Sequence, residues 1–174
     1  MTATAFHDWY YNDGTSRGYH MPRIAPYHTG PFRLAIMLQD PGGPLAGSGA
    51  QGSGEIGVRN ADGTARYIRN ELDHFNFRYS DVVLLNALPG YGLRNTVLER
   101  QRGAIFNNEA IQRAGIDCLL VAGKSIAWPV AHLMNLNSIK TAYTHHPSIR
   151  GHNACGSNVE GKRIWREALR SLLV

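Results

Sequence analysis

The sequence predicts a single-domain α/β protein with a four-stranded, mainly parallel, twisted sheet and helices on both of its faces. Three observations lead to this fold class: four short apolar runs have the length of buried strands, segments of helical periodicity alternate with them, and turn-forming residues close most of the runs. At 174 residues and 43% hydrophobic content, the chain is long enough for one domain with a full core. We find no internal repeat and no second domain in it.

Residues 1–32 are rich in His, Tyr, Pro and Gly and have no clear period, so we expect an irregular N-terminal arm that wraps the domain. The first strand is predicted over residues 33–38 and ends at a turn. Residues 42–63 contain eight glycines and little to bury, which predicts a Gly-rich loop. A helix is expected over residues 64–77, where the helically spaced apolar residues are Tyr67, Ile68, Leu72 and Phe75.

The second strand is predicted over residues 82–86, which are apolar up to the last position. A capping box at residues 96–99 starts a helix that we expect to end at Gly115. The third strand is predicted over residues 116–122, and a further helix follows over roughly residues 125–135.

The fourth strand is predicted over residues 139–144. A second capping box at residues 157–160 opens the last helix, which carries Trp165, Leu169 and Leu172 on one face. Because strands alternate with helices, we expect the strands to be parallel and their carboxyl ends to share one edge of the sheet.

The charge and the cysteine content limit the class of partner. The formal net charge is +5, the pI is near 9.5, and most of the basic residues are arginines, whose planar fork suits phosphate. This balance favours a polyanion, most commonly nucleic acid, although many unrelated proteins are equally basic. Cys118 and Cys155 supply neither a disulfide framework nor an iron–sulfur or cysteine-type zinc site. Without a signal peptide or a membrane-length apolar run, we expect a soluble, cytoplasmic protein.

Three polar residues stand at the ends of three predicted strands: Asp40 after the first, Asn86 at the end of the second and His146 after the fourth. Ligands of open parallel sheets bind outside the carboxyl ends of the strands, so a carboxylate, an amide and an imidazole are expected to converge on one crevice. Each residue also has a structural interpretation. Asp40 would start a turn, Asn86 would be a satisfied polar strand end, and His146 would be a surface histidine.

Residues 47–52 formally match the dinucleotide fingerprint G-x-G-x-x-G. That motif binds a pyrophosphate only where it links a strand directly to a helix N-terminus. Here it lies well past the first strand, and more glycines follow before any helical pattern begins. We interpret it as part of a loop and reject dinucleotide binding.

The chain carries Leu38-Gln39-Asp40-Pro41, Val83-Leu84-Leu85-Asn86 and His146-Pro147-Ser148 in this order. These segments resemble the motifs G-Q-D-P-Y-H, L-L-L-N and H-P-S-P-L of the uracil-DNA glycosylase superfamily, most closely of its uracil-specific branch. Each motif is weak alone, whereas their order and their α/β spacing over residues 33–150 make the set fairly specific. The resemblance implies a uracil-DNA glycosylase-like fold.

The resemblance also implies roles for these residues on a base that has left the DNA stack. An ionised Asp40 would stabilise the oxocarbenium-like sugar and orient or activate the attacking water. His146 would donate a hydrogen bond to O2 of the departing uracil. The Asn86 amide matches the O4 acceptor and the N3–H donor of uracil, whereas cytosine presents the reverse pattern.

Other positions are assigned in the same way, with departures from the uracil-specific branch. Gln39, through its backbone, and Pro41 would line the base pocket. After Pro41 that branch has a tyrosine that blocks the thymine methyl, whereas this chain has Gly42. The resemblance therefore implies a wider pocket that accepts some 5-substituted uracils.

The DNA-binding side of the site departs as well. Ser148 resembles a serine that grips a DNA phosphate, and Ile149 or Arg150 stands near the position of a leucine wedge that fills the vacated stack. The stacking phenylalanine of the uracil-specific branch is replaced by Ser53. The residues left open as its substitute are Phe75, Phe77 and Tyr91.

We therefore predict a monofunctional uracil-DNA glycosylase of base excision repair that works by base flipping. It is expected to be a monomer that binds DNA containing uracil at the nucleoid, with no cofactor, no metal and no membrane contact. Two alternatives stay open. One is a non-catalytic lesion-binding protein of the same fold, against which the presence of Asp40 argues. The other is a small-molecule α/β hydrolase, against which the basic charge and the lack of a serine-nucleophile motif argue.

Overall fold

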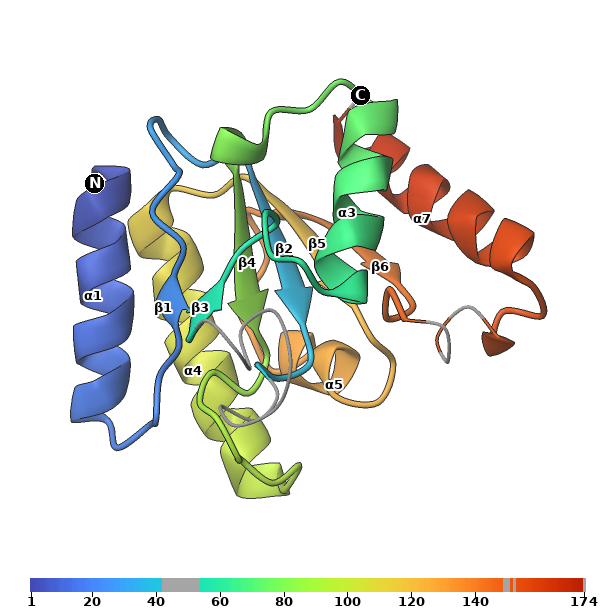
Figure 1. The fold of residues 1–174 in the computed structure, drawn as a ribbon. Helices are drawn as coiled ribbons and strands as arrows, with labels where there is room; N and C mark the ends of the chain where they lie inside the picture. Colours follow the sequence, from blue (N-terminus) through green and yellow to red (C-terminus); the bar gives the residue numbers. More distant parts are fainter. Residues whose placement is uncertain (42–53, 149–150, 152, 174) are drawn as a thin grey trace.

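The computed structural model describes residues 1–41, 54–148, 151 and 153–173. Its central sheet has four strands, all parallel, in the order β4 (Val82–Asn86), β2 (Leu34–Leu38), β5 (Cys118–Ala122) and β6 (Lys140–Thr144). The predicted fold class is confirmed, and the described sheet is wholly parallel where we expected a mainly parallel one. All four arrows point the same way, so the carboxyl ends of the strands share one edge (Figure 1).

The helices lie on both faces of the sheet, as predicted. One face is covered by α1 (Ala3–Ser16), α4 (Val97–Ala114) and α5 (Ala127–Ala131), and the other by α3 (Gly63–His74) and α7 (Asn158–Leu173) (Figure 1). Every residue of β2 and β4 is buried, as expected for parallel strands covered on both sides. Successive side chains of each strand therefore enter two different hydrophobic clusters.

The N-terminal arm was expected to be irregular, and for α1 that prediction is wrong. Thr2 Oγ1 accepts a hydrogen bond from the first turn and caps the helix. The ring of Trp9 stacks on Phe106 of α4 at 5.5 Å between centroids. The packed stripe recurs every four residues and consists of Phe6, Tyr10 and Gly14. Packing against α4 thus selects a helix in a segment whose composition resembles that of a loop.

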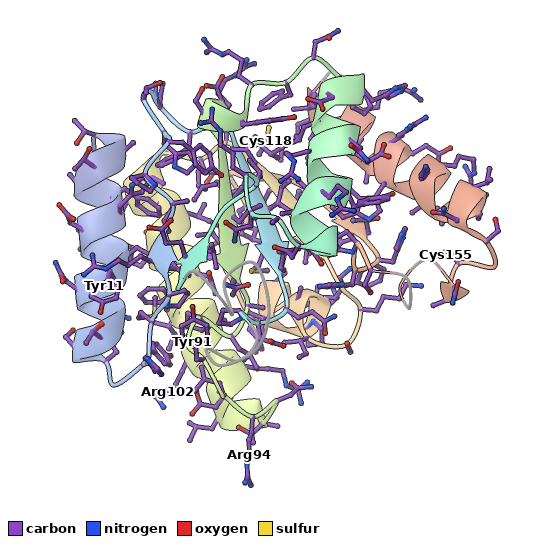
Figure 2. All side chains as sticks on the ribbon, viewed as in Figure 1. Tyr11, Tyr91, Arg94, Arg102, Cys118 and Cys155 are labelled. Carbon is purple, nitrogen blue, oxygen red and sulfur yellow. The ribbon has the colours of Figure 1, made fainter. Side chains whose placement is uncertain are left out.

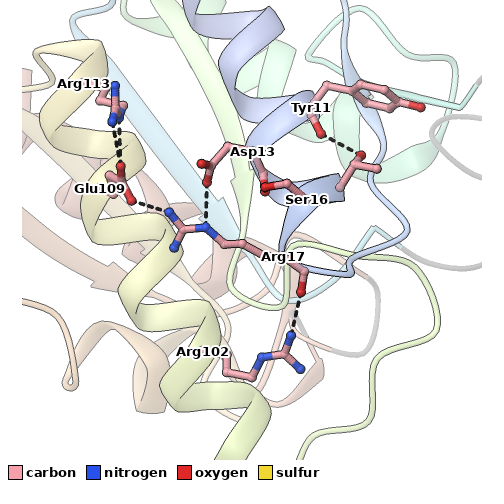
Figure 3. A network of polar contacts seen from close by, with 8 residues as sticks. Tyr11, Asp13, Ser16, Arg17, Arg102, Glu109 and Arg113 are labelled. Atoms are coloured by element: carbon pink, nitrogen blue, oxygen red, sulfur yellow. Dashed lines mark hydrogen bonds and ion pairs between the residues drawn. The ribbon is translucent and has the colours of Figure 1, made fainter.

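A polar network joins the outer side of α1 to α4 (Figure 3). Arg17 pairs with Asp13 at 2.6 Å and with Glu109 of α4 at 2.5 Å. Arg113 binds the same Glu109 carboxylate at 2.8 Å, and Arg102 donates to the main-chain oxygen of Arg17 at 2.9 Å. Hydrogen bonds from Arg113 and Arg17 lower the pKa of Glu109. The network holds the end of α1 over the middle of α4.

The remaining part of the N-terminal arm contributes a strand. β1 (Arg23–Ile24) pairs in parallel with β3 (Glu55–Ile56), which lies inside the segment 42–63 that was expected to be a loop. Ile24 and Ile56 are both buried and join the main core, which explains why these few residues are extended. The loop prediction is therefore wrong at residues 55–56, and residues 42–53 lie outside the described part of the chain.

Two helices begin close to the predicted positions because their caps act as expected. Thr96 Oγ1 accepts from Glu99 N at 3.2 Å at the start of α4, and Ser157 Oγ accepts from Glu160 N at 3.1 Å before α7. α4 ends at Gly115, whose φ of 65° is left-handed.

Two other helices differ from the prediction in length. Asp62 caps α3 through its carboxylate, so the helix begins one residue before the predicted start and ends at His74. α5 is shorter than the predicted helix over residues 125–135. Past α5 the chain leaves the helix, and Asn135 N donates to the side chain of Asn108 on α4 at 3.2 Å. A short 3₁₀ helix, η1 (Tyr79–Asp81), leads into β4. Among the described residues, no helix combines the length and the apolar character that a membrane crossing requires.

Candidate functional site

A cleft of about 1360 Å³ opens at the carboxyl edge of the sheet. Asp40, Asn86 and His146 all line it, each from the end of a different strand. The parallel register places these ends side by side, because Leu38 of β2 pairs with Asn86 of β4. The other walls come from the first turns of α3, from the segment after β5 and from the start of α7.

The backbone at the end of β2 is held on both sides. Gln39 O accepts from Leu88 N at 2.9 Å, which continues the pairing of β2 with β4 beyond the strands. The Gln39 side chain accepts from Ser125 Oγ at 2.9 Å. Gly123 allows this approach, because a Cβ there would lie 2.9 Å from Gln39 Cγ and its φ is 131°. Asp40 follows directly with an exposed side chain at the mouth of the cleft, and Pro41 is buried beside it.

Asn86 is buried in the cleft wall, with only 2% of its surface exposed. Its Nδ2 has no hydrogen-bond partner among the described residues. Leaving a buried donor unpaired costs about 1–3 kcal/mol, so this enclosed amide nitrogen in the wall of the cleft is a candidate hydrogen-bond donor.

Asn107 of α4 fixes the main chain beneath Asn86, and sequence reasoning missed it. Its Nδ2 lies 2.9 Å from Asn86 O, 3.3 Å from Ala87 O and 2.9 Å from Gly103 O. Gly103 lets α4 approach this closely, because a Cβ there would stand 2.2 Å from Ala87 O. In the sequence, the one signal for this role is that Asn107 lies one helical turn after Gly103, and that signal is weak.

The chain directly after β6 is held in place by a hydrogen bond from α7. His145 is buried, and Trp165 of α7 donates from Nε1 to His145 O at 3.0 Å. His146 is half-buried and lines the cleft. Ser148 N donates to His146 O at 2.8 Å, and Ser148 Oγ accepts from Gly151 N at 3.2 Å. In this contact the Ser148 hydroxyl accepts, so the contact does not use its proton.

Among the described residues that line the cleft, Tyr67 of α3 is the only Phe, Tyr or Trp, and it is not one of the three residues left open by the sequence. Phe75 and Phe77 do not line the cleft, and Tyr91 packs against His20 with 5.2 Å between ring centroids in the segment before α4 (Figure 2). The ring of Tyr67 meets Trp165 edge-on at 5.4 Å, and burial raises the pKa of its hydroxyl. Helical spacing marked Tyr67 as a core residue, so its place in the cleft wall was not foreseen.

Several predicted residues are not placed at the cleft. Gly42, Ile149 and Arg150 lie outside the described residues. Elsewhere on the surface, the exposed side chain of Arg94 in the segment before α4 does not line the cleft (Figure 2). Cys155 does line it, from the segment before α7, and its thiol contacts Gly151 O at 3.4 Å.

Within the described ranges, no group of three or more His, Cys, Asp or Glu side chains is arranged to hold a metal ion. Comparison of the chain with protein-family models gives no match, and comparison with curated proteins gives none either. Any functional interpretation therefore depends on the three motifs and on the cleft that their residues form.

Proposed function

We propose that the protein is a DNA glycosylase of the uracil-DNA glycosylase superfamily that hydrolyses the N-glycosidic bond of uracil in DNA. One observation carries the proposal. The carboxylate of Asp40, the amide of Asn86 and the imidazole of His146 line a single cleft at the carboxyl edge of a parallel sheet. A carboxylate and an imidazole can stabilise the charges that develop in this hydrolysis, and an amide can pair with the base.

Asp40 is the group that acts on the sugar and on the water. Its side chain is exposed at the mouth of the cleft, so water reaches it directly. As the glycosidic bond breaks, positive charge develops on the sugar, and an ionised carboxylate stabilises that charge. The same oxygens orient the water that attacks the sugar carbon and accept its proton.

Asn86 recognises the base through hydrogen bonds. Its buried Nδ2 donates to O4 of uracil, and its Oδ1 accepts from N3–H. Cytosine carries an amino donor at position 4 and an acceptor at N3. The Asn86 amide would therefore place its own donor against a donor and its own acceptor against an acceptor. Such a mismatch leaves buried polar groups unpaired and is strongly disfavoured.

His146 stabilises the leaving group by donating a hydrogen bond to O2 of uracil, where negative charge accumulates. Ser148 follows it within the same fixed turn, and its hydroxyl proton is directed to a DNA phosphate. The ring of Tyr67, braced by Trp165, gives the flipped base a surface for stacking. Residues 42–53 contain no Phe, Tyr or Trp, so that segment cannot supply such a ring.

The proposal is tested with labelled oligonucleotides that carry a single uracil, thymine, hypoxanthine or 5-hydroxymethyluracil, in single strands and in duplexes. Abasic sites are converted to strand breaks with alkali and counted. We expect breaks at uracil that require alkali, because a water-mediated mechanism leaves the abasic strand intact. Absence of breaks at uracil in every context would overturn the proposal.

A further inference from the structure

Three cationic side chains from three different elements surround the cleft. Arg66 belongs to the first turns of α3, Lys124 to the segment between β5 and α5, and Lys162 to the first turns of α7. All three are exposed and all three line the cleft. We call these residues the cationic rim.

None of the rim cations forms an ion pair with a carboxylate among the described residues. Arg66 reaches only a main-chain oxygen, Ala61 O, at 3.5 Å. Lys124 Nζ lies over the ring of Trp128 at 5.5 Å from its centroid. These charges are therefore available to an anion from outside the protein.

Two arginines of α7, the helix that carries Lys162, do form ion pairs with carboxylates. Arg163 of α7 binds Glu160 at 2.5 Å and also pairs with Glu167, and Arg166 binds the buried Glu71 at 2.7 Å. Their charges are neutralised within the protein. Lys162 lines the cleft and has no acidic partner of its own in the described structure.

The cleft has room for a ligand larger than a base. Sites for drug-sized ligands usually occupy about 300–1,000 Å³. This cleft measures about 1360 Å³. Asp62 also lines the cleft, but its carboxylate caps α3 by accepting a hydrogen bond from Ala65 N at 2.9 Å. A wide, cationic cleft fits a chain of phosphates better than a free nucleoside.

Building on the proposed function, we propose that Arg66, Lys124 and Lys162 bind phosphates of the nucleic-acid strand on either side of the nucleotide whose base enters the cleft. Exposed lysines act on phosphate as point charges, and arginine can form paired hydrogen bonds to it. These cations do not contact the reacting bond, so they act on affinity and not on turnover.

The test compares Arg66→Ala, Lys124→Ala and Lys162→Ala with Arg170→Ala. Arg170 is exposed on the same helix as Lys162 but lies outside the cleft lining, which makes it a matched control. The probe is a labelled single-stranded oligonucleotide with one uracil. A second version carries uncharged methylphosphonate linkages on both sides of the uracil.

We expect each rim variant to raise Kd and KM for the charged strand about three- to tenfold at about 0.1 M salt, with kcat unchanged. Each should also reduce the slope of log K against log salt by about 0.7, the value for one contact on a single strand. On the methylphosphonate strand the rim variants should match the wild type. Arg170→Ala should match it on both strands.

The inference is overturned if the rim variants bind the charged strand like Arg170→Ala, or if their defect persists on the uncharged strand. In the first case, normal uracil excision by the wild type would leave the proposed function standing. Conversely, weakened binding by the rim variants together with no excision by the wild type would support the rim and contradict the glycosylase. The two failures are therefore distinguishable.

Discussion

Asn107 supports the end of β4 from below, and its removal should affect both stability and activity. In Asn107→Ala, the main-chain oxygens of Asn86 and Gly103 lose a buried donor. We expect a loss of about 1–3 kcal/mol in the free energy of unfolding in urea, and a lower kcat/KM as Asn86 shifts. Asn108→Ala is the control, since Asn108 is only half-buried and accepts from Asn135 N. Equal effects of the two substitutions would contradict a special role for Asn107.

Tyr67 is expected to contribute through its ring and not through its hydroxyl. Tyr67→Phe keeps the ring and its edge contact with Trp165 and should bind uracil-containing DNA like the wild type. Tyr67→Leu removes the ring, and stacking of a base on an aromatic side chain is worth about 1–3 kcal/mol. We expect the Kd of Tyr67→Leu for a uracil-containing oligonucleotide to rise by roughly tenfold. A wild-type Kd for Tyr67→Leu would remove Tyr67 from base binding.

At the scale of elements, the contact of α1 with the segment before β2 should make stability dependent on pH. His7 of α1 meets His28 edge-on at 5.0 Å between ring centroids, and His28 Nε2 lies 2.7 Å from Val82 O. Burial first, and the neighbouring His28 second, lower the pKa of His7 to about 4 from 6.5, while Asp8 opposes the shift. Burial also lowers the pKa of His28. The folded protein thus keeps both rings neutral at a pH where the unfolded chain binds protons.

Because the unfolded state binds more protons, the free energy of unfolding falls as the pH drops from about 6.5 towards 4, and it is unaffected by these groups at higher pH. Urea unfolding at several pH values measures this slope. We expect His7→Gln to flatten it and His132→Gln, at an exposed position after α5, to leave it unchanged. An unchanged slope in His7→Gln would show that His7 does not titrate in this range.

The elements that the sequence predicted well are those that carry a local signal. β2 and β4 are continuous apolar runs, and Thr96 with Gly115 marks both ends of α4. α1 has no comparable signal, because its buried stripe mixes Phe6 and Tyr10 with glycine and depends on contact with α4. The pairing of β1 with β3 joins segments about thirty residues apart through two residues each, and no local pattern marks such a pair.

At the scale of the whole molecule, the parallel topology made part of the site predictable. Residues that follow different strands of a parallel sheet meet at one edge, and this brings Asp40, Asn86 and His146 into one cleft. Lys124 follows β5 and reaches the same edge in the same way. Tyr67, Arg66 and Lys162 come from helices, and their positions depend on how α3 and α7 pack on the sheet, which spacing along the chain does not define.

The central claim is that Asp40 drives the hydrolysis of the glycosidic bond of uracil. The most direct measurement is the single-turnover rate of uracil release by the wild type, Asp40→Asn and Asp62→Asn. Asp62 is a second carboxylate of the cleft that caps α3, and asparagine caps a helix equally well. We predict that Asp40→Asn still binds uracil-containing DNA but releases uracil about 10²–10³-fold more slowly, and that Asp62→Asn keeps the wild-type rate. A near-normal rate in Asp40→Asn would contradict the account.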